Sequence, residues 1–225
     1  LIGSLIMAHS DDHGLVIPPK LASTHLVFLP FFKTSDDRQT VSDFCERIQK
    51  HIHKIPFGMD TINTFIDKRE MRGGEKYWQQ IKEGTPILIE VGAREIEKNT
   101  LTITLRDLGP EKKQTIDVQE FIDQLPKILS DMQNRIYKRA LDSLYDHIYP
   151  IKSLDEFKKF FQKQSGFALC HWHEKAIEHP ELDKLKVTPR CIPITNLNGL
   201  ITNEYSSCIF SGEKTNKQVI FAKAY

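Results

Sequence analysis

The segment Thr85–Asp107, TPILIEVGAREIEKNTLTITLRD, determines how the rest of the chain is interpreted. It begins with a short continuous apolar run, Pro86–Val91. After a charged stretch it continues with Leu101–Leu105, which alternates as Leu-Thr-Ile-Thr-Leu. Both patterns are typical of β-strands, the second of a strand with alternating faces. The segment therefore predicts two strands close together in the sequence.

The residues on either side alternate between strand and helix patterns. Before Thr85, two strand-like runs are each followed by apolar residues at helical spacing, and the second helix is stopped by Gly84 and Pro86. This alternation predicts a layered α/β domain with a mixed sheet. The predicted segments are a strand at 24–32, a helix at 35–54, a strand at 61–66, a helix around Tyr77, Trp78 and Ile81, and an extended piece at 114–118.

A long helical stripe, from Val118 to about Tyr149, predicts a helix that connects two domains. Its cationic residues Lys127, Arg135, Lys138 and Arg139 are interpreted as a solvated face. Beyond it, shorter patterns predict a small α+β C-terminal domain, with the boundary near 150–153. Its predicted elements are a helix at 154–162, a strand at 167–171, and extended segments at 188–194, 206–210 and 218–222.

Composition limits the possible partners. The chain has 225 residues, and 31 Lys and Arg balance 30 Asp and Glu, so any site for a polyanion must be local. The longest apolar run, 26–32, is far below the roughly 20 residues of a membrane span, so no membrane partner is expected. The four cysteines are too scattered for a disulfide framework, which predicts a cytoplasmic protein.

The first residues raise a separate question. The apolar run Leu1–Met7 predicts a buried strand without partners, so we expect a C-terminal piece of a longer protein. It leads into His9–Lys20, HSDDHGLVIPPK, whose His and Asp residues allow a metal loop or a turn bent at Gly14. The whole context instead favours a substrate pocket beside a nucleotide site.

Five stretches resemble one family. IGSLIMAHSDDHGLVIPPKLAS resembles the motif 3 region of class II prolyl-tRNA synthetases of the archaeal and eukaryotic type, and TPILIEVGAREIEKNTLTITLRD resembles their anticodon-binding domain. SGFALCHWHEKAIE with RCIPI, and VIFAKAY, are similar to their C-terminal domain and terminal peptide. The resemblance implies three parts. Residues 1–23 would end a class II catalytic domain with the last strand of its antiparallel sheet, 24–150 would bind the anticodon, and 151–225 would form the C-terminal domain.

The resemblance also implies a reaction. A synthetase of this family activates proline with ATP and Mg²⁺, transfers it to tRNA(Pro), and forms a homodimer. His9, Ser10 and Gly14 match its proline pocket, and Asp11 and Asp12 would orient that loop. Lys20 stands where the family usually has an arginine on ATP phosphate, and lysine lacks the planar fork of a guanidinium. No segment resembles motifs 1 and 2, so the chain alone is expected to be inactive.

For the anticodon, the resemblance implies contacts from Arg69, Lys76 and Glu90 to two guanines, with Arg94 and Arg106 completing the pattern. A carboxylate can accept from guanine N1–H and N2–H, and cations can donate to O6 and N7. Without the resemblance, such charged residues are ordinarily solvated. Tyr77 and Trp78 are expected in the core, because they fall on the apolar side of their helix.

The C-terminal part departs from the family. Many members have a four-cysteine zinc site, and its positions here are His173, Ile177, Cys208 and Ser211. Isoleucine cannot ligate zinc, so we predict no structural zinc and a core in which Ile177, Trp172 and Phe210 replace the metal. Cys170 and Cys191 are expected to be buried apolar residues. By resemblance, the terminal Tyr225 would dock toward the active site.

Two other functions stay open. One is an accessory tRNA-binding module without synthetase activity. Such a module would need neither the loop His9–Lys20 nor Tyr225, so both features favour the synthetase. The other is a threonyl-, glycyl- or histidyl-specific relative, which is disfavoured because Pro18-Pro19 and the C-terminal domain match the prolyl type.

Overall fold

The computed structural model describes residues 1–32, 35–163 and 166–223. The chain forms two compact units, unit 1 (Leu1–Arg139) and unit 2 (Ala140–Tyr225). The division falls inside the long helix α5 (Val118–Asp146), which forms where the sequence predicts a long helix. Among the described residues, no helix has the length and apolar character to span a membrane.

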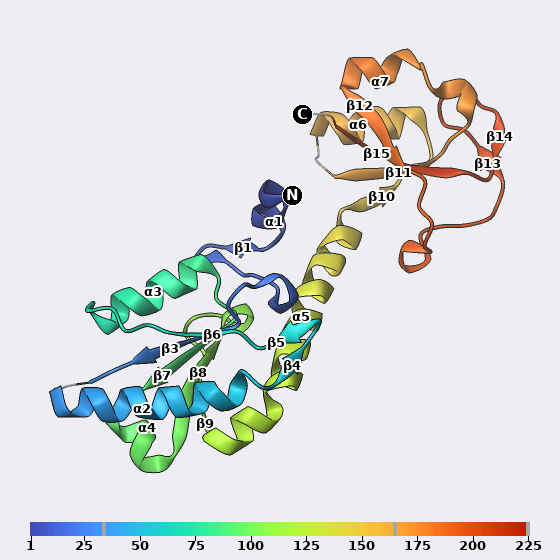
Figure 1. The fold of residues 1–225 in the computed structure, drawn as a ribbon. Coiled ribbons are helices and arrows are strands. Elements are labelled where there is room, and N and C mark those ends of the chain that lie inside the picture. The colour runs from blue at the N-terminus through green and yellow to red at the C-terminus, as the bar shows by residue number, and fades with distance from the viewer. Residues whose placement is uncertain (33–34, 164–165, 224–225) are drawn as a thin grey trace. The chain divides into compact units, whose positions relative to one another are not determined.

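Unit 1 contains a five-stranded mixed sheet with the order β6-β3-β7-β8-β9, which confirms the predicted mixed α/β fold (Figure 1). The first three strands in this order are parallel, and the last two are antiparallel to their neighbours. The predicted strand pair is β7 and β8, which lie side by side. The bounds are β3 (Leu26–Pro30), β6 (Thr64–Ile66), β7 (Ile87–Val91), β8 (Thr100–Leu105) and β9 (Lys113–Asp117).

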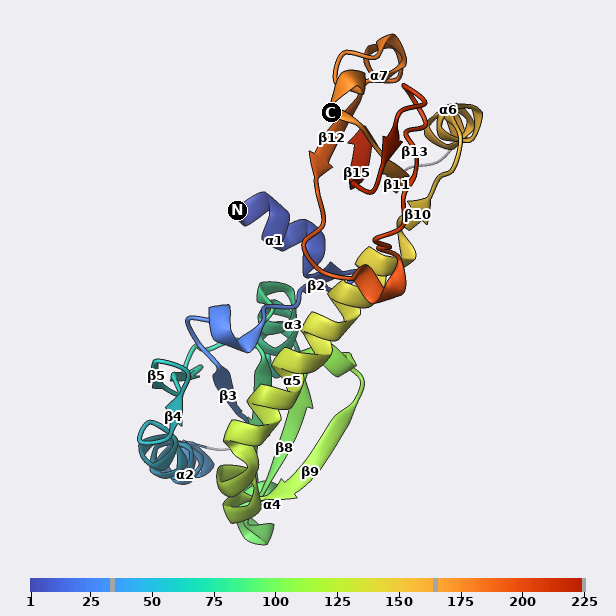
Figure 2. The same ribbon diagram turned by 90° about the vertical axis from the view of Figure 1, so that its right-hand side faces the viewer.

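Helices cover both faces of this sheet. On one face, α2 (Ser35–Ile52) and α5 pack against alternate strand residues such as Leu26 and Phe28. On the other, Tyr77 and Ile81 of α3 (Gly73–Glu83) pack against Val27, Leu29 and Leu88. The two clusters follow from the alternation of side chains along a strand. Figure 2 shows α5 and α3 on the two sides of the sheet.

One helix of unit 1 has no counterpart in the sequence predictions. The segment between β7 and β8 forms α4 (Ala93–Lys98), which ends at Asn99 in the left-handed conformation. The Glu95 side chain accepts a hydrogen bond from the Gly92 backbone N–H at 3.0 Å, which caps the first turn. Six residues are too few for a periodic apolar pattern, so the sequence does not predict this helix by periodicity. The local cap stabilises it instead.

The predicted N-terminal strand is wrong. Ile2–Ala8 forms α1, a helix without a buried residue, so the last strand of a catalytic sheet is not seen. A helix satisfies its own backbone hydrogen bonds, whereas a strand needs a neighbour. After it come the hairpin β1 (Ser10–Asp11) and β2 (Gly14–Leu15) and the 3₁₀ turn Pro19–Leu21. A second hairpin pairs β4 (Pro56–Phe57) with β5 (Asp60–Thr61).

Unit 2 contains a four-stranded sheet with the order β10-β11-β15-β12. Helix α6 (Leu154–Lys163) contributes three phenylalanines to its core, which Phe221 of β15 joins. The bounds are β10 (Ile148–Pro150), β11 (Phe167–His171), β12 (Val187–Cys191), β15 (Gln218–Lys223) and α7 (Pro180–Leu185), with a hairpin of β13 (Ser206–Ser207) and β14 (Lys214–Thr215).

The two cysteines predicted to be buried differ. Cys170 lies in the central strand β11 and is buried, as predicted. Cys191 is exposed at the end of β12, so that prediction is wrong. Strand β12 is an edge strand with a register shift between Pro189 and Cys191, and the sequence pattern does not reveal this irregularity.

Candidate functional site

The carboxyl ends of β6, β3 and β7 form the edge of the sheet in unit 1 at which a ligand is expected to bind. From β3 the chain runs through α2 to β6 on one side, and from β6 through α3 to β7 on the other. Ligands of open α/β sheets bind where the chain diverges in this way. The loop with Arg69 follows β6, Glu90 lies in β7, and Arg94 follows it in α4. The structure therefore brings three of the predicted residues to one end of the sheet.

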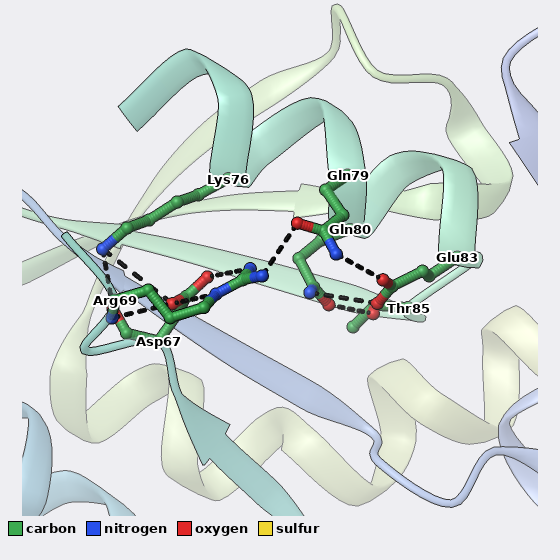
Figure 3. A network of polar contacts seen from close by, with 7 residues as sticks. All are labelled: Asp67, Arg69, Lys76, Gln79, Gln80, Glu83 and Thr85. Atoms are coloured by element: carbon green, nitrogen blue, oxygen red, sulfur yellow. Dashed lines mark hydrogen bonds and ion pairs between the residues drawn. The ribbon is translucent and has the colours of Figure 1, made fainter. Parts of the chain in front are cut away.

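A buried carboxylate organises the loop after β6 (Figure 3). The Asp67 side chain has no exposed surface, and Arg69 donates to it from Nε at 2.9 Å and from Nη2 at 2.7 Å. Lys76 Nζ donates to the Asp67 carbonyl at 2.9 Å and lies 3.9 Å from its carboxylate. The hydrogen bonds from Arg69 and the charge of Lys76 lower the pKa of Asp67. This carboxylate stays ionised and holds both cations in place.

Lys76 is therefore placed differently from Arg69. Its side chain is only 4% exposed, and burial lowers the pKa of its amine while the charge of Asp67 opposes this shift. The Arg69 side chain is 41% exposed, and two bonds to Asp67 raise the pKa of its guanidinium. Of these two predicted contacts, Arg69 is the one whose charged end reaches solvent, whereas Lys76 is buried behind Asp67.

Arg69 begins a chain of hydrogen bonds along α3 (Figure 3). Its Nη1 donates to Gln79 Oε1 at 2.9 Å, and Gln79 Nε2 donates to Glu83 Oε1 at 2.9 Å. The second oxygen of Glu83 accepts from Gln80 at 3.1 Å, and Gln80 in turn accepts from Thr85 Oγ1 at 2.7 Å. The network fixes a cation, Arg69, and a carboxylate, Glu83, in one connected set of side chains.

A cavity of about 380 Å³ lies beside this network. Phe65 of the edge strand β6 lines it and is 48% exposed. Arg69 retains N–H groups that are not used within the network, and each Glu83 oxygen retains a lone pair. An aromatic surface that lines the same cavity as a hydrogen-bond donor and an acceptor suits an unstacked nucleobase. The cavity is lined by Ile17, Ala22, Ser23, Thr24, Val27, Phe65, Arg69, Gln79, Gln80, Glu83, Thr85 and Pro86.

Four of these lining residues were missed by the sequence analysis: Phe65, Gln79, Gln80 and Glu83. The spacing of Lys76, Gln79, Gln80 and Glu83 offers a signal, because residues three and four apart share one face of a helix. That face carries polar residues next to the Asp67–Glu70 loop. The exposed Phe65 has no such signal, since a phenylalanine within a strand is ordinarily expected to be buried.

Glu90 does not line this cavity. Its side chain is 16% exposed and lies 2.6 Å from Lys113 Nζ. The same ammonium group lies 4.6 Å from the centre of the Tyr77 ring. Arg94 is exposed in the first turn of α4, and we find no hydrogen bond or ion pair for it among the described residues. These two residues belong to a neighbouring part of the same edge.

Arg106 has another role than the predicted one. The residue is 1% exposed, and its guanidinium donates to both carboxylate oxygens of Asp11 at 2.7 and 2.6 Å. It also donates to the carbonyls of Ile81 at 3.0 Å and Gly14 at 3.2 Å. The hydrogen bonds from Arg106 to Asp11 lower the pKa of the Asp11 carboxyl group to about 2. The buried guanidinium is occupied within the protein, which corrects its interpretation as an anticodon contact.

The predicted proline and phosphate residues lie on the β1–β2 hairpin and just beyond it. The His9 carbonyl accepts from Val16 N–H at 2.8 Å, and burial followed by the nearby Arg139 charge lowers the pKa of its imidazole. Ser10 is exposed. Gly14 has φ +129°, a conformation that favours glycine. The Lys20 side chain is exposed, and its backbone N–H donates to Gln133 Oε1 at 3.1 Å.

The prediction that Tyr77 and Trp78 both lie in the core is half wrong. Tyr77 is 6% exposed, but Trp78 is 42% exposed. Adjacent residues on a helix point about 100° apart, and α3 buries only one face against the sheet. The Trp78 ring lies 5.9 Å from that of His13 in the hairpin loop.

In unit 2, three of the four degenerate zinc positions lie close together. The Cys208 thiol accepts from Ser211 N–H at 3.5 Å. Burial acts to raise the pKa of Cys208, but hydrogen bonds from Ser211, Phe210 and His173 outweigh it and lower that pKa. Ile177 is 65% exposed, so its predicted core role is wrong, whereas Trp172 and Phe210 do pack against the core.

The residues at these positions do not fit a structural zinc ion. Isoleucine has no ligating atom, and serine rarely binds zinc. The described residues contain no group of three or more His, Cys, Asp or Glu side chains arranged to hold a metal. Tyr225, the predicted docking residue, lies outside the described residues.

Comparisons with known proteins bear on both units. Residues 26–128 match the family model of the anticodon binding domain, and residues 154–225 match that of the prolyl-tRNA synthetase C-terminal domain. Unit 1 is thus similar to an anticodon binding domain, and unit 2 is similar to the C-terminal domain of prolyl-tRNA synthetases. The first matched region contains Arg69 and most of the residues that line the cavity beside it. The second matched region contains the degenerate zinc positions.

Curated relatives match the whole chain. A Proline--tRNA ligase of Bdellovibrio bacteriovorus is 38% identical over 229 residues, covering 100% of this chain and 45% of the relative. Those of Protochlamydia amoebophila and Rhodopirellula baltica are 34% and 35% identical and also cover the whole chain. The chain thus spans about half the length of these relatives, all three of which are bacterial.

Proposed function

We propose that this chain is the C-terminal part of an enzyme that activates proline with ATP and Mg²⁺ and transfers it to tRNA(Pro). The observation that carries this proposal is the continuous match of the relatives named Proline--tRNA ligase to 100% of the chain. Unit 1 supplies anticodon recognition, and the segment His9–Lys20 supplies one edge of the active site. The parent acts in the cytoplasm as a homodimer.

Anticodon recognition is centred on the cavity beside Arg69. Arg69 donates to the O6 and N7 acceptors of a guanine that stacks on Phe65, and Glu83 accepts from its N1–H and N2–H groups. Lys76 acts through Asp67, which keeps Arg69 in position. Glu90 and Arg94 contact the second guanine at the adjacent ends of β7 and α4. Support comes from the donor Arg69 and the acceptor Glu83 in the network and from the exposed aromatic ring of Phe65 that lines the same cavity.

Binding of an anticodon stem-loop tests this proposal on the 225-residue chain. We expect a tRNA(Pro) stem-loop to bind about tenfold or more tightly than one in which both anticodon guanines are replaced by adenine, because one bidentate contact discriminates by about 1–3 kcal/mol. Fluorescence anisotropy at constant salt measures both affinities. Equal affinities would contradict guanine recognition by this chain.

At the active-site edge, His9, Ser10 and Gly14 line the proline pocket and Lys20 neutralises an ATP phosphate. Tyr225 docks against the same site. In the complete synthetase, Lys20→Gln should raise the KM for ATP about tenfold, since a charge-assisted contact is lost, while Lys20→Arg should preserve or lower it. A KM unchanged by Lys20→Gln removes Lys20 from the phosphate site. Deletion of residues 224–225 should reduce aminoacylation.

The proposal also covers the type of synthetase and the borders between its functional parts. We assign the parent to the archaeal and eukaryotic type, on the motif 3 resemblance and the C-terminal domain that follows the anticodon-binding domain. Functional borders lie at 23/24 and 150/151. Unit 2 folds without structural zinc, so elemental analysis should find less than about one-tenth equivalent of zinc, and a chelator should not shift the unfolding midpoint. One tightly bound equivalent would refute this.

The alternative is an accessory tRNA-binding module. Such a module needs the cavity beside Arg69 but has no use for a charged loop at His9–Lys20. Sequence upstream of Leu1 separates the two functions: motifs 1 and 2 of a class II synthetase there support the ligase, and their absence from the complete gene supports the module.

A further inference from the structure

The hairpin β1–β2 is held to unit 1 by one buried side chain. Arg106 follows β8 directly, and its guanidinium reaches Asp11, 95 positions away in the sequence, through two short hydrogen bonds. Two more bonds from the same group end on the carbonyls of Gly14 in the hairpin and Ile81 in α3. Arg106 therefore joins three separate segments of the chain.

Close packing accompanies this ion pair. A Cβ atom added to Gly14 would lie 2.6 Å from the Lys82 Cα atom, and one added to Gly84 would lie 2.7 Å from Leu15. Ile17 N–H donates to the Gly84 carbonyl at 3.3 Å. The next residue inward, Val16, is 1% exposed within the main core. The hairpin is thus seated on the end of α3 without space between them.

The contact of the hairpin β1–β2 with Arg106 and the end of α3 is called the hairpin joint. Helix α3 contributes both to this joint and to the cavity. Its residues Lys76, Gln79 and Glu83 hold or line the Arg69 site, while the Ile81 carbonyl and the backbone at Lys82 contact Arg106 and the hairpin. A helix of 11 residues with buried Tyr77 and Ile81 moves as one body. The position of the hairpin is consequently set by the same helix that shapes the base cavity.

We propose that Arg106 is a positioning residue, whose ion pair with Asp11 fixes the segment His9–Lys20 against the C-terminal end of α3. The functional part of this inference rests on the proposed synthetase activity. Within it, the anticodon-binding domain carries the proline-pocket loop as part of its own fold. Loss of the Arg106–Asp11 pair releases the loop and slows proline activation while anticodon binding is retained.

Arg135 provides a matched control. The neighbour of Arg106 in the chain, Asp107, has a side chain that is 2% exposed and accepts two hydrogen bonds from Arg135 of α5, at 2.6 and 3.2 Å. This pair resembles Arg106–Asp11 in chemistry, and Asp107 belongs to the same 3₁₀ turn as Arg106 (Arg106–Leu108). It leads to α5, however, and not to the hairpin. Arg135→Gln removes it without touching Asp11.

Hydrogen exchange on the 225-residue chain tests the joint itself. In Asp11→Asn and Arg106→Lys, the amides of Val16 and Ile17, which donate to His9 and Gly84, should exchange about tenfold or more faster. In Arg135→Gln they should keep the wild-type rate. Asp11 is 41% exposed, so Asp11→Asn remains informative even if Arg106→Lys fails to fold. Unchanged exchange in Asp11→Asn would overturn the inference.

Proline-dependent ATP–pyrophosphate exchange tests the consequence in the complete synthetase. Asp11→Asn should lower kcat about tenfold or more, because a misplaced loop loses its reacting geometry, and should leave stem-loop affinity unchanged. Arg135→Gln should retain wild-type kcat. An equal fall in both variants would overturn the positioning role, since general destabilisation would explain it. A wild-type enzyme without proline-dependent exchange would refute the proposed function, while the amide rates would still decide the joint.

Discussion

Arg69 and Arg106 are two arginines of unit 1 that each grip one aspartate through two hydrogen bonds, yet their burial is reversed. At the cavity, the Asp67 side chain is fully buried and the Arg69 side chain is 41% exposed. At the hairpin joint, the Arg106 side chain is 1% exposed and the Asp11 side chain is 41% exposed. At the cavity, the arginine–aspartate pair therefore leaves its guanidinium partly exposed to solvent. At the hairpin joint, the buried guanidinium also donates to backbone carbonyls.

The difference teaches that pairing alone does not define a role. A guanidinium has five N–H donors, and what remains after the carboxylate is satisfied decides its use. Arg106 directs further donors to Ile81 and Gly14, which are internal. Arg69 directs one to Gln79 on the wall of the cavity. Four predictions test this contrast.

The largest expected effect is on stability at the joint. Arg106→Met should lower the free energy of unfolding by about 3–5 kcal/mol, as expected when a buried ion pair loses one partner. Arg69→Gln should cost only about 1–2 kcal/mol, because Lys76 and the Arg69 backbone N–H still hold Asp67. Urea unfolding followed by circular dichroism measures both. A larger loss for Arg69→Gln would reverse the comparison.

A steric test at the joint comes next. Gly14→Ala should cost at least about 2 kcal/mol, because the new Cβ meets the Lys82 backbone at a positive φ. Gly74 lies at the start of α3, where an added Cβ finds no atom within 4 Å, so Gly74→Ala should be neutral or stabilising by up to about 1 kcal/mol. Thermal unfolding of both variants measures the difference. Equal stabilities would show that the hairpin is not closely seated.

A smaller effect is expected on RNA affinity. Arg69→Gln should weaken binding of the tRNA(Pro) stem-loop about tenfold, as one bidentate base contact is worth about 1–3 kcal/mol. Lys127→Gln removes the same charge from an exposed site on α5 and should weaken binding less than about threefold at the same salt. If the two variants lose affinity equally, Arg69 acts through its charge alone.

The smallest expected effect is a pH dependence. Arg106 lowers the pKa of Asp11 from 3.8 to about 2, so the ionised carboxylate contributes stability above about pH 4, and this contribution is lost as the pH falls through 2. The difference in unfolding free energy between wild type and Asp11→Asn should therefore be constant from about pH 5 to 7 and shrink below about pH 4. Urea titrations at each pH measure it. A difference that persists at pH 2 would mean that the carboxylate charge is not its source.

Sequence reasoning was most successful where local pattern and burial coincide. The stripe of Val41, Phe44 and Ile48 predicts α2, and the alternation at Leu101–Leu105 predicts β8, because one face of each element meets the same core along its length. It was less successful for short or edge segments. The apolar run 1–7 fits a strand or a helix equally, and the available hydrogen-bond partners decide between them.

The site was predictable only in part. The resemblance singled out Arg69 and Lys76, which the structure brings together at Asp67, but it gave no reason to separate an exposed arginine from a buried lysine. Glu83 escaped notice because a carboxylate near a helix end is ordinarily solvated. Only the structure shows that Glu83 lines the cavity and that Gln79 and Gln80 each donate a hydrogen bond to one of its carboxylate oxygens.

By itself, the sequence determined the longer strands and helices and the family resemblance, because these depend on residue types at short spacing. Only the tertiary structure decided which member of each arginine–aspartate pair is buried. Asp11 and Arg106 lie 95 positions apart in the sequence. The exposed fraction of each side chain is set by the close packing of the hairpin against α3. Burial is a property of the packed surroundings, so residue type and spacing cannot supply it.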